Sequence, residues 1–198
     1  AEGTGDLIAA VPASVTPKQP VALTFNHMLS QVKFTFTNED ADTYTMKISD
    51  IKIESAVTTC TGTYTNTDGA SWNGGTANGT YDFGTLDNIA GTTGTTDLLV
   101  IPQNNANLYV TFTATFTDDS DSETPIAEGN FKASLKYTAN GTGTDNLWTP
   151  GYKYNYTATI NASTIEDTLE ENIIKFEVTA VEGWKDATEQ KPTLDKQE

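Results

Sequence analysis

The sequence contains no arginine, and all eleven of its basic residues are lysine. Against them stand 27 acidic residues, so the formal net charge is −16 at pH 7. Recognition of phosphate groups needs clustered cations and commonly uses the guanidinium fork. A chain this acidic repels nucleic acid and anionic lipid. The composition therefore excludes both from the partners that we expect.

Cysteine is also scarce: Cys60 stands alone, so no intramolecular disulfide forms and stability must come from packing. Long apolar runs are missing, since the longest run, Leu98 to Ile101, is far too short to cross a bilayer. The first residues lack the basic start and apolar stretch of a signal peptide. The abundance of Thr, Asn and Gly is typical of an exported chain, which we expect to be a processed form or a fragment.

What the sequence does contain is period-two alternation of apolar and polar residues, which predicts half-buried antiparallel β-strands. In three segments the alternating apolar residues are Val32, Phe34 and Phe36; Leu108, Val110, Phe112, Ala114 and Phe116; and Phe131, Ala133, Leu135 and Tyr137. Further strands are expected at residues 21–25, 44–55, 57–64, 97–101, 152–160 and 173–181. No convincing helical period occurs, and residues 163–172 are expected to form a loop or a single turn.

The alternation changes phase within the longest strand candidate. Met46 and Ile48 share one face, whereas Ile51 and Ile53 share the other, with Asp50 between the two pairs. A β-bulge at this point would return both pairs to one core. We therefore predict a bulge or bend beside Asp50.

Strand-sized runs joined by turn-rich links favour an all-β fold, an antiparallel Greek-key β-sandwich. We expect the sandwich domain at residues 20–184. The N-terminal segment 1–19 would hold a remnant strand of a preceding domain, and residues 185–198 would form a polar tail. Residues 65–94, rich in Gly, Asn and Thr, are expected to form an extended surface excursion with one short strand at most, at residues 81–83.

No catalytic, cofactor or metal site is indicated. His27, the sole histidine, has no second histidine and no cysteine at ligand spacing, so we expect a structural role for it. The acidic run Asp118 to Glu123 could offer oxygen ligands to calcium, but it lacks the glycine turn and terminal acid of an EF-hand loop. A solvated hairpin tip is the favoured interpretation. These observations predict a chain that is not an enzyme.

Aromatic side chains supply the remaining candidate site, because they can stack on sugar rings. The candidates are Trp72, Tyr81, Trp148, Tyr152 and Trp184. Tyr152 alternates with Tyr154 and Tyr156 in one predicted strand, which favours a place in or beside the core. Only Trp72 stands in a predicted loop with no packing pattern around it. The alternative function is therefore a carbohydrate-binding surface module that uses exposed aromatics such as Trp72.

Three motifs occur in an order and spacing that are more specific than any one of them. The first is the segment Pro20 to Phe36, which includes Phe25-x-His27-x-Leu29; the second is Leu99-Val-Ile-Pro-Gln103; the third is Trp148-Thr-Pro-Gly-Tyr152, with a last strand that ends in Trp184. Together they resemble the fimbrillin family of Bacteroidetes, Mfa-like or type V pilin-like surface proteins, mainly its C-terminal domain. The resemblance spans most of residues 6 to 184.

The resemblance implies a transthyretin-like sandwich and export to the outer membrane surface, with attachment through a lipid anchor outside this chain. It implies a fimbrial subunit or fimbria-associated adhesin, joined to other pilin subunits by β-strand addition. Host or bacterial surface glycans or proteins would be its adhesion partners. His27 would have a structural role.

Two features depart from the family pattern. Only Asp6 to Ala10 could be the final strand of the N-terminal domain that the family usually has. The tail 185–198 carries few apolar residues and would be a poor donor strand, which leaves shaft, tip and free-standing roles open. Because some pilins of the family are activated by cleavage after arginine, a chain without arginine is expected to resist such a protease.

Overall fold

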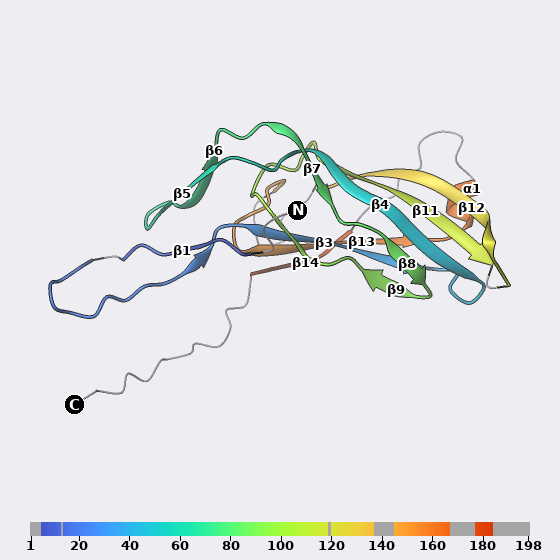
Figure 1. The fold of residues 1–198 in the computed structure, drawn as a ribbon, viewed down its shortest axis with the longest axis horizontal. Coiled ribbons are helices and arrows are strands. Elements are labelled where there is room, and N and C mark those ends of the chain that lie inside the picture. The colour runs from blue at the N-terminus through green and yellow to red at the C-terminus, as the bar shows by residue number, and fades with distance from the viewer. Residues whose placement is uncertain (1–4, 13, 119, 137–144, 167–176, 184–198) are drawn as a thin grey trace, which may run out of the picture.

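The computed structural model describes residues 5–12, 14–118, 120–136, 145–166 and 177–183. In this part the chain forms an elongated β-sandwich, with a narrow extension at one end (Figure 1). Trp184 and the predicted tail 185–198 lie outside the described residues. Within the described ranges, no helix has both the length and the apolar character needed to span a membrane.

Two five-stranded sheets form the sandwich. The first has the order β10 (Leu98–Val100), β3 (Ser30–Asn38), β13 (Tyr152–Ile160), β14 (Glu177–Gly183), and β9 (Thr92–Gly94) also pairs with β3. The second has the order β12 (Asp121–Ser134), β11 (Tyr109–Asp118), β4 (Tyr44–Val57), β7 (Ala77–Asp82), and β8 (Leu86–Ile89) also pairs with β4. Two small hairpin-like pairs and one helical turn complete the fold: β1 (Ile8–Ala9) with β2 (Asn26–His27), β5 (Thr61–Thr65) with β6 (Gly69–Asn73), and α1 (Ser163–Glu166).

The predicted all-β sandwich is confirmed, but one ladder runs in a direction that the sequence did not indicate. β3 and β13 pair in parallel, from Gln31 opposite Lys153 to Asn38 opposite Ile160. All other ladders among the described strands are antiparallel. Because these two strands lie far apart in the sequence, no hairpin turn dictates their relative direction.

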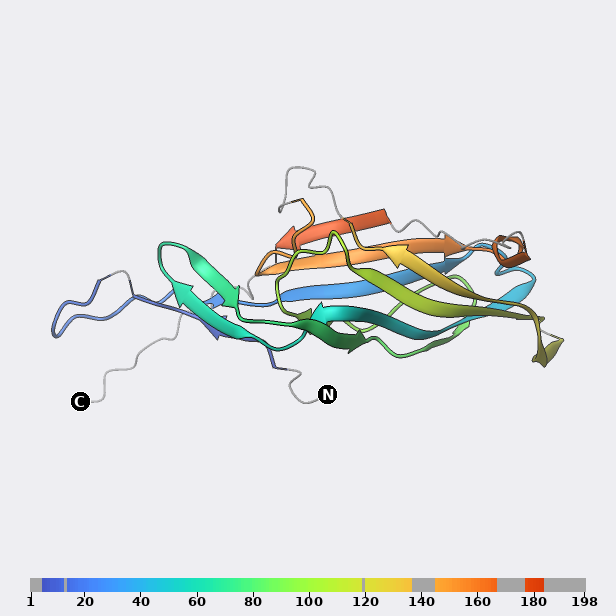
Figure 2. The same cartoon turned by 90° about the horizontal axis from the view of Figure 1, so that it is seen from above.

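The core lies between the two sheets, as the edge-on view in Figure 2 shows. Alternate residues of the predicted strands supply it, and Phe34, Phe36 and Phe116 are fully buried. Phe36 of one sheet meets Phe112 of the other edge to face, with ring centroids 5.0 Å apart. Burial of large aromatic side chains in such pairs is a major source of sandwich stability.

The predicted bulge is confirmed. Met46, Ile48, Ile51 and Ile53 all reach the core and are fully buried. Asp50 has a positive φ of 53°, and the β4–β11 ladder shifts register beside it. The kink turns the strand so that both apolar pairs face inward.

Two predicted features are wrong. Residues 65–94 contain the whole of β6, β7, β8 and β9 rather than an extended excursion with one short strand at most. Short strands can add backbone hydrogen bonds to β4, to β3 or to each other without any apolar alternation. Residues 21–25 do not form a strand, and the apolar side chains there are exposed. The described start of segment 163–172 is the single turn α1, as expected.

Candidate functional site

The N-terminal arm, residues 5–12 and 14–28, extends beyond the same end of the sandwich as the β5–β6 hairpin (Figures 1 and 2). Its two limbs are joined by the short β1–β2 ladder, in which Ile8 lies opposite His27. Asp6 Oδ2 also contacts His27 Nδ1, so the first limb is tied to the second by a side-chain contact. His27 thus joins parts of the arm.

The arm carries most of the large hydrophobic side chains that are exposed in the described residues. Of nine exposed large hydrophobic side chains in the described residues, seven belong to it: Leu7, Ile8, Val11, Val15, Val21, Leu23 and Phe25. The side chain of Phe25 is 56% exposed. Exposed large apolar side chains gathered on one segment indicate an interaction site.

The β5–β6 hairpin is fastened to the arm by two side chains. Trp72 Nε1 donates a hydrogen bond to the Met28 carbonyl at 3.2 Å, and Asn26 Nδ2 donates to the Tyr64 hydroxyl at 2.7 Å. Trp72 also lies over Gly62 of the facing strand, where a Cβ would come within 2.7 Å of its ring. The prediction that Trp72 occupies a loop without packing is therefore wrong: it is a half-buried strand residue that anchors the hairpin.

A groove, here called the end groove, opens where the arm, the hairpin and a turn of the sandwich meet. Its lining comes from residues 24–27, from Tyr64 and residues 68–70 of the hairpin, and from residues 149–152, and its volume is about 490 Å³. Three segments that are distant in the sequence thus share one concave surface. No sequence pattern predicts such a surface, because it depends on how the hairpin docks.

The turn on the third side of the groove is the Pro-Gly motif noted in the sequence. Tyr152 N donates to the Thr149 carbonyl at 3.2 Å, and Gly151 has a φ of 77°, as the third residue of a type II turn requires. Gly151 N donates to the Leu29 carbonyl at 2.8 Å, which holds the turn against the base of the arm. Tyr152 is thereby fixed at the edge of both the core and the groove.

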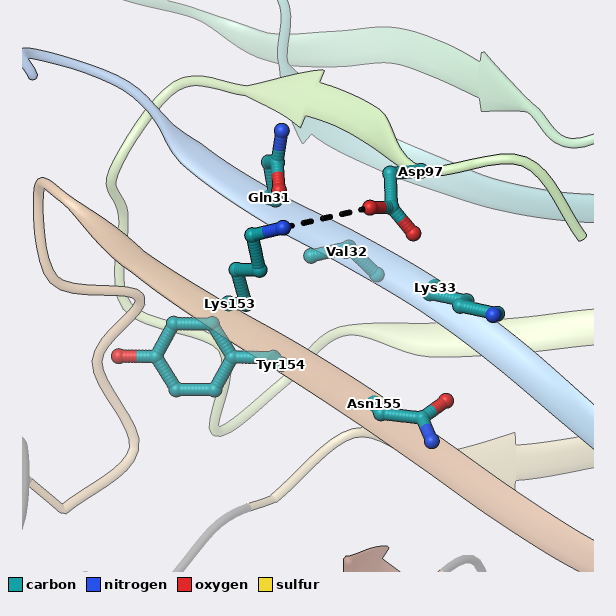
Figure 3. A pocket seen from close by; sticks show the side chains of 7 residues that line it. All are labelled: Gln31, Val32, Lys33, Asp97, Lys153, Tyr154 and Asn155. Atoms are coloured by element: carbon teal, nitrogen blue, oxygen red, sulfur yellow. Dashed lines mark ion pairs between the residues drawn. The ribbon is translucent and has the colours of Figure 1, made fainter. Parts of the chain in front are cut away.

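A second, smaller pocket of about 200 Å³ lies on the outer face of the first sheet. Figure 3 shows Gln31, Lys153 and Asp97 converging, while the Lys33 ammonium points away from them. Lys153 Nζ and Asp97 Oδ2 are 3.8 Å apart, so the two charges are paired. Gln31 Oε1 is buried and has no hydrogen-bond partner among the described residues. The polar groups of the pocket are an ion pair and amide side chains. These groups do not form the pair of nucleophile and general base that a catalytic site would need.

The acidic segment Asp118 to Glu123 lies at the β11–β12 junction, as expected for a hairpin between two strands. Asp118 accepts hydrogen bonds from the backbone and hydroxyl of Ser120, which lower the pKa of its carboxyl group. Residue 119 and the side chains of residues 121–123 lie outside the description, so calcium binding stays an untested hypothesis. Across the described ranges, no three His, Cys, Asp or Glu side chains form a group that could hold a metal ion.

The other aromatic candidates in the described residues are Trp148, Tyr81 and Tyr152; the first two belong to the core or pack against it, and Tyr152 also lines the end groove. Trp148 is fully buried, and Tyr154 and Tyr156 are buried with it, as the strand pattern predicts. Tyr81 is half-buried, donates to the Val57 carbonyl at 2.9 Å and accepts from Ile101 N at 3.0 Å. Its hydroxyl is thus committed to backbone partners. Sequence reasoning missed Phe25 and Tyr64 as site residues, although both line the end groove.

Comparison with known families gives a match to a model described as fimbrillin-like, over residues 3–184. Among solved structures, a fimbrial protein from Bacteroides vulgatus is 16% identical with a TM-score of 0.54, over 82% of this chain and 56% of that one. A candidate cell adhesion protein from Bacteroides uniformis is 20% identical with a TM-score of 0.40, over 90% of this chain and 66% of that one. No curated protein gives a significant match. The first structure shows a related fold, and the chain spans about half of its length.

Proposed function

The chain belongs to the fimbrillin-like family, and we propose on that basis that it is a cell-surface fimbrial subunit or fimbria-associated adhesin. Its role is structural and adhesive, without catalysis. The finer features of this proposal are export to the outer membrane surface and attachment through a lipid anchor outside the chain. Shaft, tip and free-standing positions are all compatible with it.

One observation carries the proposal: the second limb of the arm is an exposed, extended segment without a strand partner. Val21, Leu23 and Phe25 alternate along it, and all three side chains are exposed. Among the described residues, no β-ladder includes residues 21–25. A segment of this kind can pair with a strand of another subunit, with backbone hydrogen bonds for affinity and alternate side chains for specificity.

The rest of the surface suits an assembly made by specific strand addition. Thr111, Thr113 and Thr115 line the outer face of β11, where they keep β propensity and stay compatible with water. The net charge of −16 makes unspecific side-by-side association of sheets unfavourable. Addition at the arm would thus be favoured over random edge pairing.

The domain boundaries belong to this proposal. We assign the sandwich to residues 20–184, an N-terminal segment that would hold a remnant strand of a preceding domain to residues 1–19, and a polar tail to residues 185–198. The observation behind it is that Ile8–Ala9 forms a strand, which makes a short ladder with β2. The partners would be other pilin subunits, and adhesion would be to surface glycans or proteins.

The test is a gel of sheared cell-surface material, run with and without boiling and blotted for this chain. A ladder that collapses only on boiling is expected for subunits joined by strand addition. The double substitution Leu23→Asp with Phe25→Asp should remove the ladder, because charged side chains cannot fill apolar sites on a partner. A single band in both lanes for the unmodified chain would contradict subunit assembly.

The matched control is Tyr109→Asp. Tyr109 is 40% exposed but lies on β11, which has β12 and β4 on its two sides and no free edge. This variant should keep the ladder. Loss of the ladder in both variants would indicate a general effect of added charge rather than a role of the arm.

A further inference from the structure

We propose that the end groove is a binding site for a neutral saccharide. It rests on the adhesive role proposed above and names the class of ligand, and it is independent of subunit assembly, because neither strand pairing nor the core needs an open groove at this place. It also differs from the sugar site predicted at Trp72, because Trp72 does not line the groove. Of the aromatic candidates named from the sequence, the groove includes Tyr152, together with Phe25 and Tyr64.

The aromatic part of the site comes from three separate segments. Phe25 of the arm, Tyr64 of β5 and Tyr152 of β13 all line the groove. Phe25 is more than half exposed, and Tyr64 and Tyr152 are half-buried, so part of each side chain faces solvent. Aromatic rings combine a flat apolar face with, in tyrosine, a polar tip, and this suits the mixed surface of a sugar ring.

The polar part has unused hydrogen-bonding capacity. Asn26 donates through Nδ2 to Tyr64, but its Oδ1 accepts no hydrogen bond from the described residues, and the Tyr64 hydroxyl hydrogen is likewise not donated to any of them. Asp68 Oδ2 accepts from Thr65 Oγ1 at 3.2 Å, while its Oδ1 has no partner in the described part. An amide oxygen, a carboxylate and a phenol together can receive and supply the hydrogen bonds of neighbouring sugar hydroxyls.

The charge of the lining selects the class of saccharide. The residues that line the groove include Asp68 and no lysine, and the ring of its one histidine, His27, contacts Asp6. With a net charge of −16 on the chain, sialylated, uronic or sulfated ligands would be repelled. The structure therefore favours uncharged hexoses and N-acetylhexosamines over acidic sugars.

The groove is held by fixed contacts rather than by loose loops. The hairpin turn that carries Asp68 is closed by Asp68 N donating to Thr65 Oγ1 at 3.0 Å, and Gly69 follows with a φ of 70°. Trp72 fastens the hairpin to Met28 from outside the groove, so it acts as a positioning residue. A volume of about 490 Å³ is within the range of about 300 to 1,000 Å³ that is usual for ligand sites.

The experiment titrates the chain with neutral di- and trisaccharides of glucose, galactose, mannose and N-acetylglucosamine, alongside sialyllactose, by calorimetry and saturation-transfer NMR. At least one neutral oligosaccharide should bind in the millimolar range or tighter, and sialyllactose should bind more weakly. Tyr152→Ala and Tyr64→Ala should each weaken binding about tenfold, since one lost aromatic stacking contact has an effect of that order.

Two conservative variants distinguish a loss of binding from a loss of folding. Asp68→Asn and Tyr64→Phe keep side-chain shape, and each should weaken binding several-fold with an unchanged thermal melt. Tyr109→Ala removes an exposed tyrosine of β11 that does not line the groove, and it should leave binding unchanged. No binding by any neutral sugar at millimolar concentration, tighter binding of sialyllactose, or an equal effect of Tyr109→Ala would each overturn the proposal. None of these results depends on the gel ladder that tests subunit assembly.

Discussion

The indole of Trp148 donates a hydrogen bond from Nε1 to the hydroxyl of Tyr156 at 2.9 Å, and both side chains are fully buried. The same hydroxyl accepts from Asn105 Nδ2 at 3.2 Å and donates to the Leu135 carbonyl at 3.1 Å. One tyrosine oxygen therefore satisfies groups from three other segments. A hydroxyl with this many partners connects the end of β12 to β13 inside the core.

Tyr156→Phe should destabilise the chain by about 2–4 kcal/mol, because it leaves buried donors and an acceptor without partners while the aromatic packing remains. Urea unfolding followed by tryptophan fluorescence would measure the change. Tyr109→Phe is the matched control, since Tyr109 is exposed, and it should stay within about 0.5 kcal/mol. Equal changes in the two variants would show that the Tyr156 hydrogen bonds contribute little.

The side-chain amide of Gln103 forms hydrogen bonds with both backbone groups of Val57, the last residue of β4, as a neighbouring strand would. Its Oε1 accepts from Val57 N at 2.8 Å, and its Nε2 donates to the Val57 carbonyl at 3.0 Å. Gln103→Ala should cost about 1–3 kcal/mol of unfolding free energy, because a backbone N–H loses its partner. Gln31→Ala is the comparison, since the Gln31 Oε1 is already without a partner, and its effect in urea unfolding should be clearly smaller.

The close approach of Gly62 to Trp72 makes a local prediction. Gly62→Ala would place a Cβ 2.7 Å from the indole, which must shift and lose its hydrogen bond to Met28. Amide exchange in β5 and β6 should then become faster, while global stability changes little, because the hairpin lies outside the core. Gly91→Ala, where a Cβ would meet nothing within 4 Å, should leave hairpin exchange unchanged.

Asp50 and Lys52 form an exposed hydrogen-bonded ion pair at 2.8 Å, which lowers the pKa of the Asp50 carboxyl below its ordinary value of 3.8. A lowered folded-state pKa stabilises the folded chain above about pH 3.8, and this contribution disappears as pH falls through the folded-state pKa. NMR titration should find the Asp50 midpoint below 3.8, and Lys52→Gln should return it toward 3.8. An unchanged midpoint in that variant would rule out Lys52 as the cause.

The alternation of apolar and polar residues along the sequence was sufficient to predict the central strands. Phe112 and Phe116 alternate with threonines, and the structure places them in the core as predicted. The phase slip beside Asp50 was also enough to predict the bulge. Pattern failed where strands are short and polar, as in Gly69–Asn73, because their pairing depends on a neighbouring backbone and not on their own side chains.

The sequence by itself determined the all-β class, the core residues and the family motifs, because side-chain alternation and turn residues act over a few neighbouring positions. Only the tertiary structure decided the parallel pairing of β3 with β13 and the docking of Trp72 on Met28. It also decided the groove that Tyr64 and Tyr152, from distant segments, both line. These features join segments far apart in the chain, and their energy comes from backbone pairing and shape fit that no local pattern records.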